Sequence, residues 1–180
     1  HYSSRRQRQM CIRDSNGPDR PQQLNRVELR VCDLVSDPRD LLAITAFAEL
    51  RLLQLLERGN SDDPLFSSDL SAEDLAVLAD HNDQQAATAS LDAELRHWRD
   101  GRPITARRWI GEQLQELKGW GQQQPALAWL DRLPALLERG NTAMQWIQRH
   151  SSGESISDIL SRDIQDLATL EQQLLEGGLG

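Results

Sequence analysis

Residues 25–33 alternate strictly between charged and apolar side chains, and no other part of the chain constrains the fold as much. The charged positions are Arg26, Glu28 and Arg30, and the apolar ones between and after them are Val27, Leu29 and Val31. A period of two is typical of a β-strand with one buried face. We therefore predict a strand over about residues 25–33, with the charged side chains together on its other face.

The period changes after Asp37 and Pro38. Asp37 fits the N-cap of a helix, and Pro38 fits the first helical position, where an amide hydrogen would be unpaired anyway. Apolar residues then recur at near-helical spacing, at Leu41, Leu42, Ile44, Ala48, Leu52 and Leu55. Gly59 and Asn60 form a stop signal. The strand is therefore expected to turn directly into a long apolar helix.

A second helix is predicted to begin after Ser71. Ser71 and Asp74 have the spacing of a capping pair, in which the first side chain accepts a hydrogen bond from the amide of the second residue. The helix is expected to extend as far as Trp98, with or without a break near residues 81–82. A turn at residues 100–101, Asp-Gly, should follow it.

Later caps and breaks predict the remaining helices. Thr105 is expected to cap one helix, and Ser155 to cap the last. Pro134 should divide the region 122–139 into two short helices that meet near Leu133, because proline removes a hydrogen bond and clashes with the preceding turn. The fold class is thus a mostly α fragment of an α+β fold, with one strand followed by about six helices.

A single strand cannot satisfy its own backbone hydrogen bonds when it is buried. The strand at 25–33 must therefore pair with strands that the chain does not obviously contain. We expect residues 16–176 to be the C-terminal part of a larger protein.

Composition limits the classes of partner. The chain has 180 residues, a net charge of −8 and 27% charged residues, which disfavours a nucleic-acid binder with its usual basic face. No apolar run approaches the ~20 residues of a membrane helix. Two cysteines provide no disulfide framework, so a reducing cytoplasm is the expected location. Nothing in the sequence sets the oligomeric state.

Residues 1–15 differ from the rest of the chain, because they contain four arginines against one aspartate and have no usable periodicity. The run M-C-I-R-D-S resembles translated adapter sequence, so we expect this segment to be non-native or disordered. The alternative is a basic arm that contacts nucleic acid or a partner.

The charged face of the predicted strand places Glu28 between two guanidiniums. Side chains two residues apart on a strand are separated by ~6.6–7 Å. A carboxylate can ligate Mg²⁺, and arginines can clamp phosphate or carboxylate groups. The alternative is an ordinary solvated face whose charges compensate one another.

Two stretches resemble a known enzyme family. The run R-V-E-L-R-V-C-D, followed by D-P and a helix, resembles the R-x-E-x-R element of glutamine synthetase and its relatives. The run L-D-A-E-L-R-H-W-R-D-G-R-P-I-T-A-R is similar to glutamate–cysteine ligases of the carboxylate–amine ligase branch, its cyanobacterial-type members in particular. The resemblance covers roughly residues 24–170.

This resemblance implies an ATP-dependent ligase that joins the γ-carboxyl group of glutamate to the amine of cysteine, the first step of glutathione synthesis. It implies ATP and Mg²⁺ as cofactors, with Glu28 as metal ligand and Arg26 on the nucleotide phosphates. Arg30 would contact the transferring phosphate or the substrate carboxylate. Most of the family's sheet would precede Asn16, so the fragment alone should be inactive. The alternative from another class is a non-enzymatic helical interaction domain.

Other polar residues are weaker candidates. His81, Asn82 and Gln85 would share one helix face, either toward the site or toward solvent. Arg102 would contact a phosphate or substrate, or form a surface ion pair. Cys32 is either a reactive thiol beside the arginines or a small buried filler.

Overall fold

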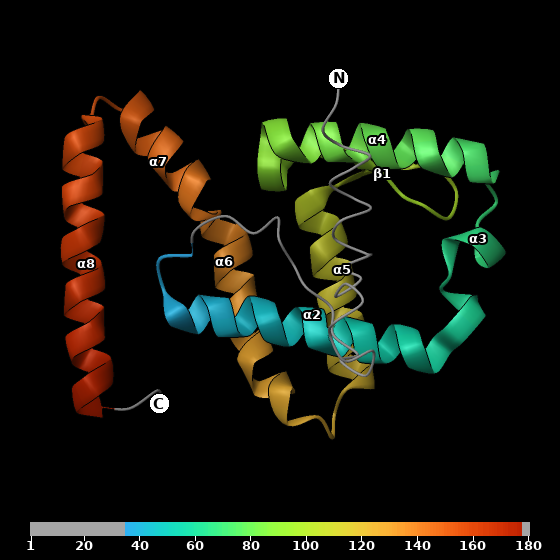
Figure 1. Cartoon of the computed structure of the whole chain (residues 1–180), viewed down its shortest axis with the longest axis horizontal. Coiled ribbons are helices and arrows are strands. Elements are labelled where there is room, and N and C mark those ends of the chain that lie inside the picture. The colour runs from blue at the N-terminus through green and yellow to red at the C-terminus, as the bar shows by residue number, and fades with distance from the viewer. Residues whose placement is uncertain (1–34, 178–180) are drawn as a thin grey trace, which may run out of the picture. The chain divides into compact units, whose positions relative to one another are not determined.

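The structure, a computed structural model, describes residues 35–177, which belong to one unit of the chain. The predicted strand at 25–33 and the segment 1–15 lie outside the described residues. The described part is mostly helical with a short two-stranded sheet (Figure 1), as the predicted fold class requires. None of its helices is long and apolar enough to cross a membrane.

The α-helices of the described part are α2 (Pro38–Arg58), α3 (Pro64–Ser67), α4 (Ala72–Ala89), α5 (Ala106–Trp120), α6 (Leu133–Arg139), α7 (Thr142–Ser151) and α8 (Ile156–Gly177). The 3-10 segments are η1 (Gly59–Ser61), η2 (Ser90–Asp92) and η3 (Pro125–Arg132). The strands β1 (Glu94–Arg96) and β2 (Pro103–Thr105) pair antiparallel, with Leu95 opposite Ile104.

The helices begin at the predicted capping residues. Asp37 accepts a hydrogen bond from the amide two residues on, at 2.8 Å, and Pro38 opens α2. Ser71, Thr105 and Ser155 each accept one from the amide three residues on, at 3.1–3.3 Å. These bonds satisfy amides that the first turn of a helix leaves unpaired. The predicted break near Leu133 is also confirmed, because η3 ends there and α6 begins.

The prediction that the second helix extends to Trp98 is wrong. α4 ends at Ala89, and Ser90 follows with a φ of 53°. Residues 94–96 then pair with residues 103–105, and the chain reverses at Gly101, which has a φ of 73°. The turn at residues 100–101 was predicted, but strands of three residues are too short to show an alternating pattern. Backbone pairing between the two strands decided the outcome over local helical spacing.

Asn82 fastens this hairpin to α4. Its side-chain amide donates to the carbonyl of Arg96 at 2.8 Å, and its side-chain oxygen accepts from the amide of Arg96 at 2.7 Å. The side chain thus mimics a neighbouring strand on the outer side of β1.

We expect Asn82→Ala to lower the free energy of unfolding by about 1 kcal/mol, because two hydrogen bonds in a partly exposed position are replaced by bonds to water. Urea denaturation measures this loss, and hydrogen exchange at the Arg96 amide should accelerate. Gln84→Ala, on the exposed side of the same helix, is the control and should leave both quantities unchanged. Equal effects of the two substitutions would contradict the proposed role of Asn82 in holding the hairpin to α4.

The core lies where α2 packs against α5, η3 and α6 (Figure 1). Its buried members are Ala43, Ala46, Leu50, Leu114, Leu117, Leu130 and Leu133. Trp120 and Trp129 pack against this cluster and are partly buried. α2 therefore contributes two alanines and Leu50 to the buried cluster, with Ile44 and Phe47 packed against it, and the segments around it contribute leucines.

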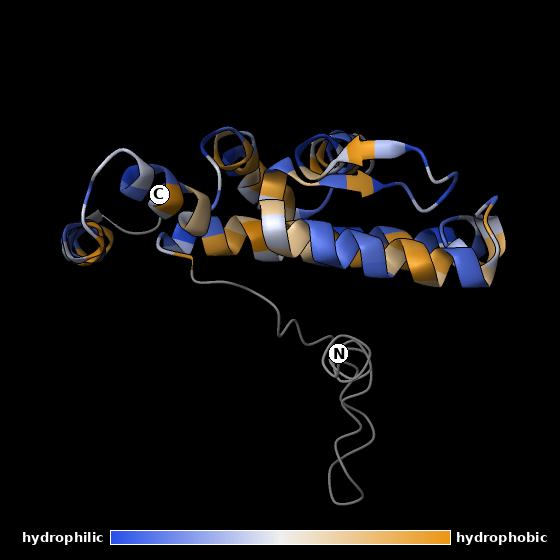
Figure 2. Cartoon of the chain, turned by 90° about the horizontal axis from the view of Figure 1, so that it is seen from above, coloured by the Kyte–Doolittle hydropathy of each residue, from blue (hydrophilic) through white to orange (hydrophobic). Residues whose placement is uncertain are grey.

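The leucines of α2 mostly lie on its other side. Leu41 is 47% exposed and Leu56 is 79% exposed, and Leu42, Leu52 and Leu53 are also exposed. At 3.6 residues per turn, Leu41, Leu52 and Leu56 lie opposite the core-facing stripe, whereas Leu42 and Leu53 lie at its flank. Figure 2 shows hydrophobic segments along the length of α2. The sequence spacing predicts an apolar face on α2. Most of that face does not pack into the core of the described part.

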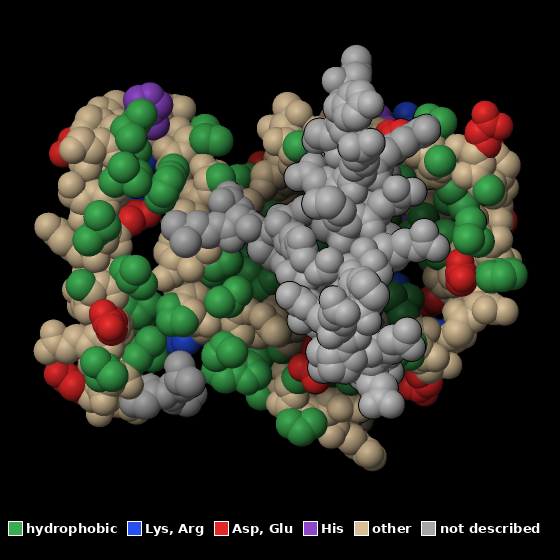
Figure 3. Space-filling view, viewed as in Figure 1, with side chains coloured by type: hydrophobic (Ala, Val, Ile, Leu, Met, Phe, Trp, Pro, Cys, Tyr) green, Lys and Arg blue, Asp and Glu red, His purple; other side chains and the backbone are tan. Residues whose placement is uncertain are grey.

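The last helix also leaves most of its apolar stripe exposed. The helix α8 forms where the sequence predicts it, and its Ile159 is buried. Exposed apolar residues of the same helix are Ile156, Leu160, Ile164, Leu167 and Leu175. Hydrophobic side chains follow α8 along one edge of the face seen in Figure 3.

Candidate functional site

The strand residues that carry the predicted chemistry lie outside the described residues. They are Arg26, Glu28 and Arg30, together with the nearby Cys32. What the structure describes is α2, the helix that follows the predicted strand in the sequence. Its first turn and its last turns each carry a cluster of charged side chains.

The first cluster is centred on Asp40, which is 4% exposed. One carboxylate oxygen of Asp40 accepts hydrogen bonds from Arg132, the closer at 2.9 Å, and the other accepts one from Arg139. Arg132 also donates to Asp37 at 2.9 Å. The first turn of α2 is thereby held to η3 and α6.

Asp37 is the outer member of this cluster. Burial alone would raise the pKa of Asp37, but hydrogen bonds from Arg39 and the charges of Arg39 and Arg132 outweigh it and hold the pKa below its ordinary value of 3.8. Asp37 therefore remains a carboxylate at neutral pH and caps α2 as an anion. The sequence predicts this cap but not its arginine partner, which lies 95 residues away.

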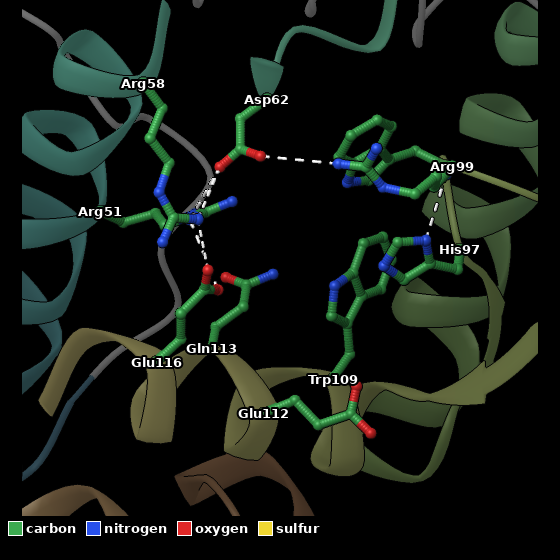
Figure 4. A pocket seen from close by; sticks show the side chains of 10 residues that line it. Arg51, Arg58, Asp62, His97, Arg99, Trp109, Glu112, Gln113 and Glu116 are labelled. Atoms are coloured by element: carbon green, nitrogen blue, oxygen red, sulfur yellow. Dashed lines mark hydrogen bonds and ion pairs between the residues drawn. The ribbon is translucent and has the colours of Figure 1, made fainter. Parts of the chain in front are cut away.

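The second cluster surrounds an open hollow of about 220 Å³. Arg51 and Arg58 of α2 form one wall, and Trp109 of α5 and Arg99 of the β1–β2 loop form the other (Figure 4). Asp62, which follows η1, lies at the rim between the walls. The hollow thus joins three segments that are far apart in the sequence.

Asp62 faces three guanidiniums. Its carboxylate lies 3.0 Å from Arg58, 3.6 Å from Arg99 and 3.8 Å from Arg51. Glu116 of α5 pairs with Arg58 and lies 3.9 Å from Arg51. The side chain of Asp62 is only 12% exposed, so these contacts are partly shielded from water.

Aromatic rings line the other end of the hollow. The ring of His97 stacks on Trp98 with 5.6 Å between centroids, and lies 5.0 Å from the ring of Trp109. The guanidinium of Arg99 lies over Trp98, 4.6 Å from its centroid. The nitrogen Nδ1 of His97 accepts a hydrogen bond from the amide of Arg99 at 3.1 Å, so this nitrogen carries no proton.

The environment of His97 makes it resist protonation. Burial lowers its pKa from the ordinary value of 6.5, and the positive charges of Arg102 and Arg99 lower it further, against opposing effects of Asp100 and Glu112. As pH falls below about 6.5, the unfolded chain takes up a proton on this residue before the folded chain does.

We therefore expect the free energy of unfolding to fall with pH from about 6.5 down to the lowered pKa of His97. In His97→Gln, which keeps a hydrogen-bond acceptor and cannot titrate, this part of the pH dependence should be reduced. Urea denaturation at a series of pH values measures it, with the exposed His150 changed to Gln as the control. An unchanged slope in His97→Gln would contradict the prediction.

Two of the other predicted polar residues, Asn82 and Arg102, have structural partners. The side chain of Asn82 binds the main chain of Arg96, as described above, and so acts in the fold. Arg102 pairs with Asp100 at 3.0 Å, which is the surface ion pair that the sequence left open as the alternative. Between residues 35 and 177, no three His, Cys, Asp or Glu side chains are grouped so as to hold a metal ion. Glu28, the predicted ligand, lies outside these residues.

Comparison with known proteins places the chain in a family. Residues 2–162 match the model of glutamate-cysteine ligase family 2 (GCS2). No curated protein and no solved structure gives a significant match. Since the match covers most of the chain, the chain belongs to glutamate–cysteine ligase family 2, a family of ligase-type enzymes.

Proposed function

We propose that the chain is the C-terminal part of a cytoplasmic, ATP-dependent ligase that forms γ-glutamylcysteine from glutamate and cysteine. The observation that carries this proposal is the family match over residues 2–162. ATP and Mg²⁺ are the proposed cofactors. The fragment by itself is proposed to be inactive, because the remaining metal and nucleotide groups would lie on a sheet that precedes it.

The residues assigned to the reaction are those of the strand at 25–33. Glu28 would offer a charged oxygen to Mg²⁺, which prefers such ligands. Arg26 would bind nucleotide phosphate, and Arg30 would hold the transferring phosphate or the substrate carboxylate. Phosphoryl transfer depends mainly on positioning and on neutralising charge, and two arginines beside a carboxylate suit both.

The exposed leucines of α2 support the same proposal. Leu41, Leu52 and Leu56 lie on the side of α2 away from the described core, and the exposed Leu42 and Leu53 flank that side. Complete burial of one such side chain stabilises a protein by about 1.5–3 kcal/mol. Because several leucines are exposed together, covering them would be strongly favourable, and we interpret this face of α2 as a packing surface. We infer that another part of the full-length protein covers this face, while the cluster at Asp40 holds α2 on the described core.

The test is an assay of the full-length gene product for ADP release with ATP, glutamate and a panel of amines. Turnover that depends on cysteine is expected. Turnover with a different amine would keep the ligase reaction and change the acceptor. A well-folded protein without turnover on any amine would overturn the proposal in favour of a helical interaction domain.

A further inference from the structure

We propose that the hollow between α2, the β1–β2 loop and α5 binds a small organic monocarboxylate with a flat apolar body. This site lies among residues that the proposed reaction does not use. The proposal rests on the charge balance of the hollow, on the bonding of Arg51 and on the indole of Trp109.

The charges at the hollow do not cancel. Three guanidiniums, those of Arg51, Arg58 and Arg99, face the carboxylates of Asp62 and Glu116. A third carboxylate at the hollow, Glu112, is engaged by Arg108 at 2.7 Å. One positive charge is therefore left over at a partly buried site. A ligand with a single negative charge would neutralise it, whereas a phosphate ester with nearly two would exceed it.

Arg51 is the guanidinium that can accept such a ligand. Its contacts with Asp62 and Glu116, at 3.8 and 3.9 Å, exceed hydrogen-bond distance. Among the described residues, the side chain that accepts a hydrogen bond from Arg51 is Gln54, which is neutral. The arginine fork matches the two oxygens of a carboxylate, so a ligand carboxylate could make the charge-assisted bonds that the protein carboxylates do not make.

Trp109 provides the apolar part of the site. Figure 4 shows its indole beside the hollow, across from Arg51 and next to His97. A flat apolar body can stack on an indole face while its carboxylate reaches toward the guanidiniums. At about 220 Å³ the hollow is smaller than the clefts that hold drug-sized ligands, which limits the ligand to about the size of one ring with its carboxylate.

The experiment is a titration of the complete chain with benzoate, followed by the indole N–H signals of its five tryptophans in nitrogen–proton NMR spectra. The Trp109 signal is assigned as the one missing from Trp109→Phe. We expect it to shift with a dissociation constant of about 1 mM, typical of a weak ligand of this size. Benzyl alcohol and benzylamine, which keep the ring but lack the negative charge, should leave it in place.

Variants test the role of Arg51. Arg51→Gln should weaken benzoate binding by about tenfold or more, since a charge-assisted bond is lost. Arg51→Lys should retain part of the affinity. Arg162→Gln is the matched control, because Arg162 is largely exposed on α8, pairs with Glu154 and does not line the hollow. Its affinity should equal that of the unchanged chain.

Three results would overturn the proposal. The first is no shift of the Trp109 signal at benzoate concentrations up to ~20 mM, well above the expected constant. The second is an equal shift with benzyl alcohol, which would make the site merely apolar. The third is unchanged affinity in Arg51→Gln. The first two comparisons measure binding to the unchanged chain, and a variant enters them only through the assignment of the Trp109 signal.

Discussion

Replacing Glu28 by glutamine in the full-length protein is expected to lower the rate of ATP-dependent γ-glutamylcysteine formation by about 10²–10³-fold, the usual loss when a charge-stabilising group is removed from an active site. Glutamine keeps the shape of the side chain and removes its negative charge, which Mg²⁺ prefers in a ligand. ADP release with glutamate and cysteine, measured over a range of Mg²⁺ concentrations, should show both a lower maximal rate and a higher Mg²⁺ requirement.

The control for Glu28→Gln is Glu171→Gln. Glu171 is exposed on α8 and lies outside the residues matched by the family model. This variant should retain the rate and the Mg²⁺ requirement of the unchanged enzyme. If Glu28→Gln behaved in the same way, Glu28 would not be a metal ligand, although the chain would still belong to the ligase family.

Asp40→Asn is expected to lower the free energy of unfolding by about 3 kcal/mol, near the lower end for breaking a buried ion pair from one side. The carboxylate is buried, and it accepts from both Arg132 and Arg139. The amide would leave two guanidiniums without their countercharge and would place an N–H group against one of them. Both arginines can partly reach solvent, which keeps the loss from being larger. Chemical denaturation of the 180-residue chain measures it.

Asp131→Asn is the matched control for this stability measurement. Asp131 pairs with Lys118 at 2.6 Å, but its side chain is 76% exposed, so its loss should stay within about 0.5 kcal/mol. In a double-mutant cycle, Asp40→Asn and Arg139→Gln should couple, because the two residues are in direct contact. Equal losses for Asp40→Asn and Asp131→Asn would show that the cluster at the start of α2 does not hold this helix.

Local chemistry accounts for the parts of the fold that the sequence predicts well. Asp37, Ser71 and Thr105 each bond an amide two or three residues away, so their effect can be read from a few neighbouring residues. Pro134 acts in the same short range. The hairpin at residues 94–105 escaped prediction because its strands are stabilised by each other and by Asn82, and three residues carry no detectable period.

The candidate functional residues likewise include some that the sequence suggests and others that only the tertiary structure brings together. The alternation of Arg26, Glu28 and Arg30 suggested a charged strand, and the resemblance assigned those residues their chemistry. No local pattern marks Arg51 and Trp109 as neighbours, because they lie on α2 and α5 and meet only when these helices pack. The same holds for Asp40, whose arginine partners lie more than 90 residues away.

The sequence by itself thus determined the family of the chain, the starts of its helices and the prediction of a charged strand followed by a long helix. These features depend on residue order over short distances or on extended runs of similarity. Only the tertiary structure decided which side of α2 is buried. Helical spacing identifies apolar positions but not the partner that covers them. Here Ala43, Ala46 and Leu50 face the neighbouring helices, while Leu41, Leu52 and Leu56 remain exposed.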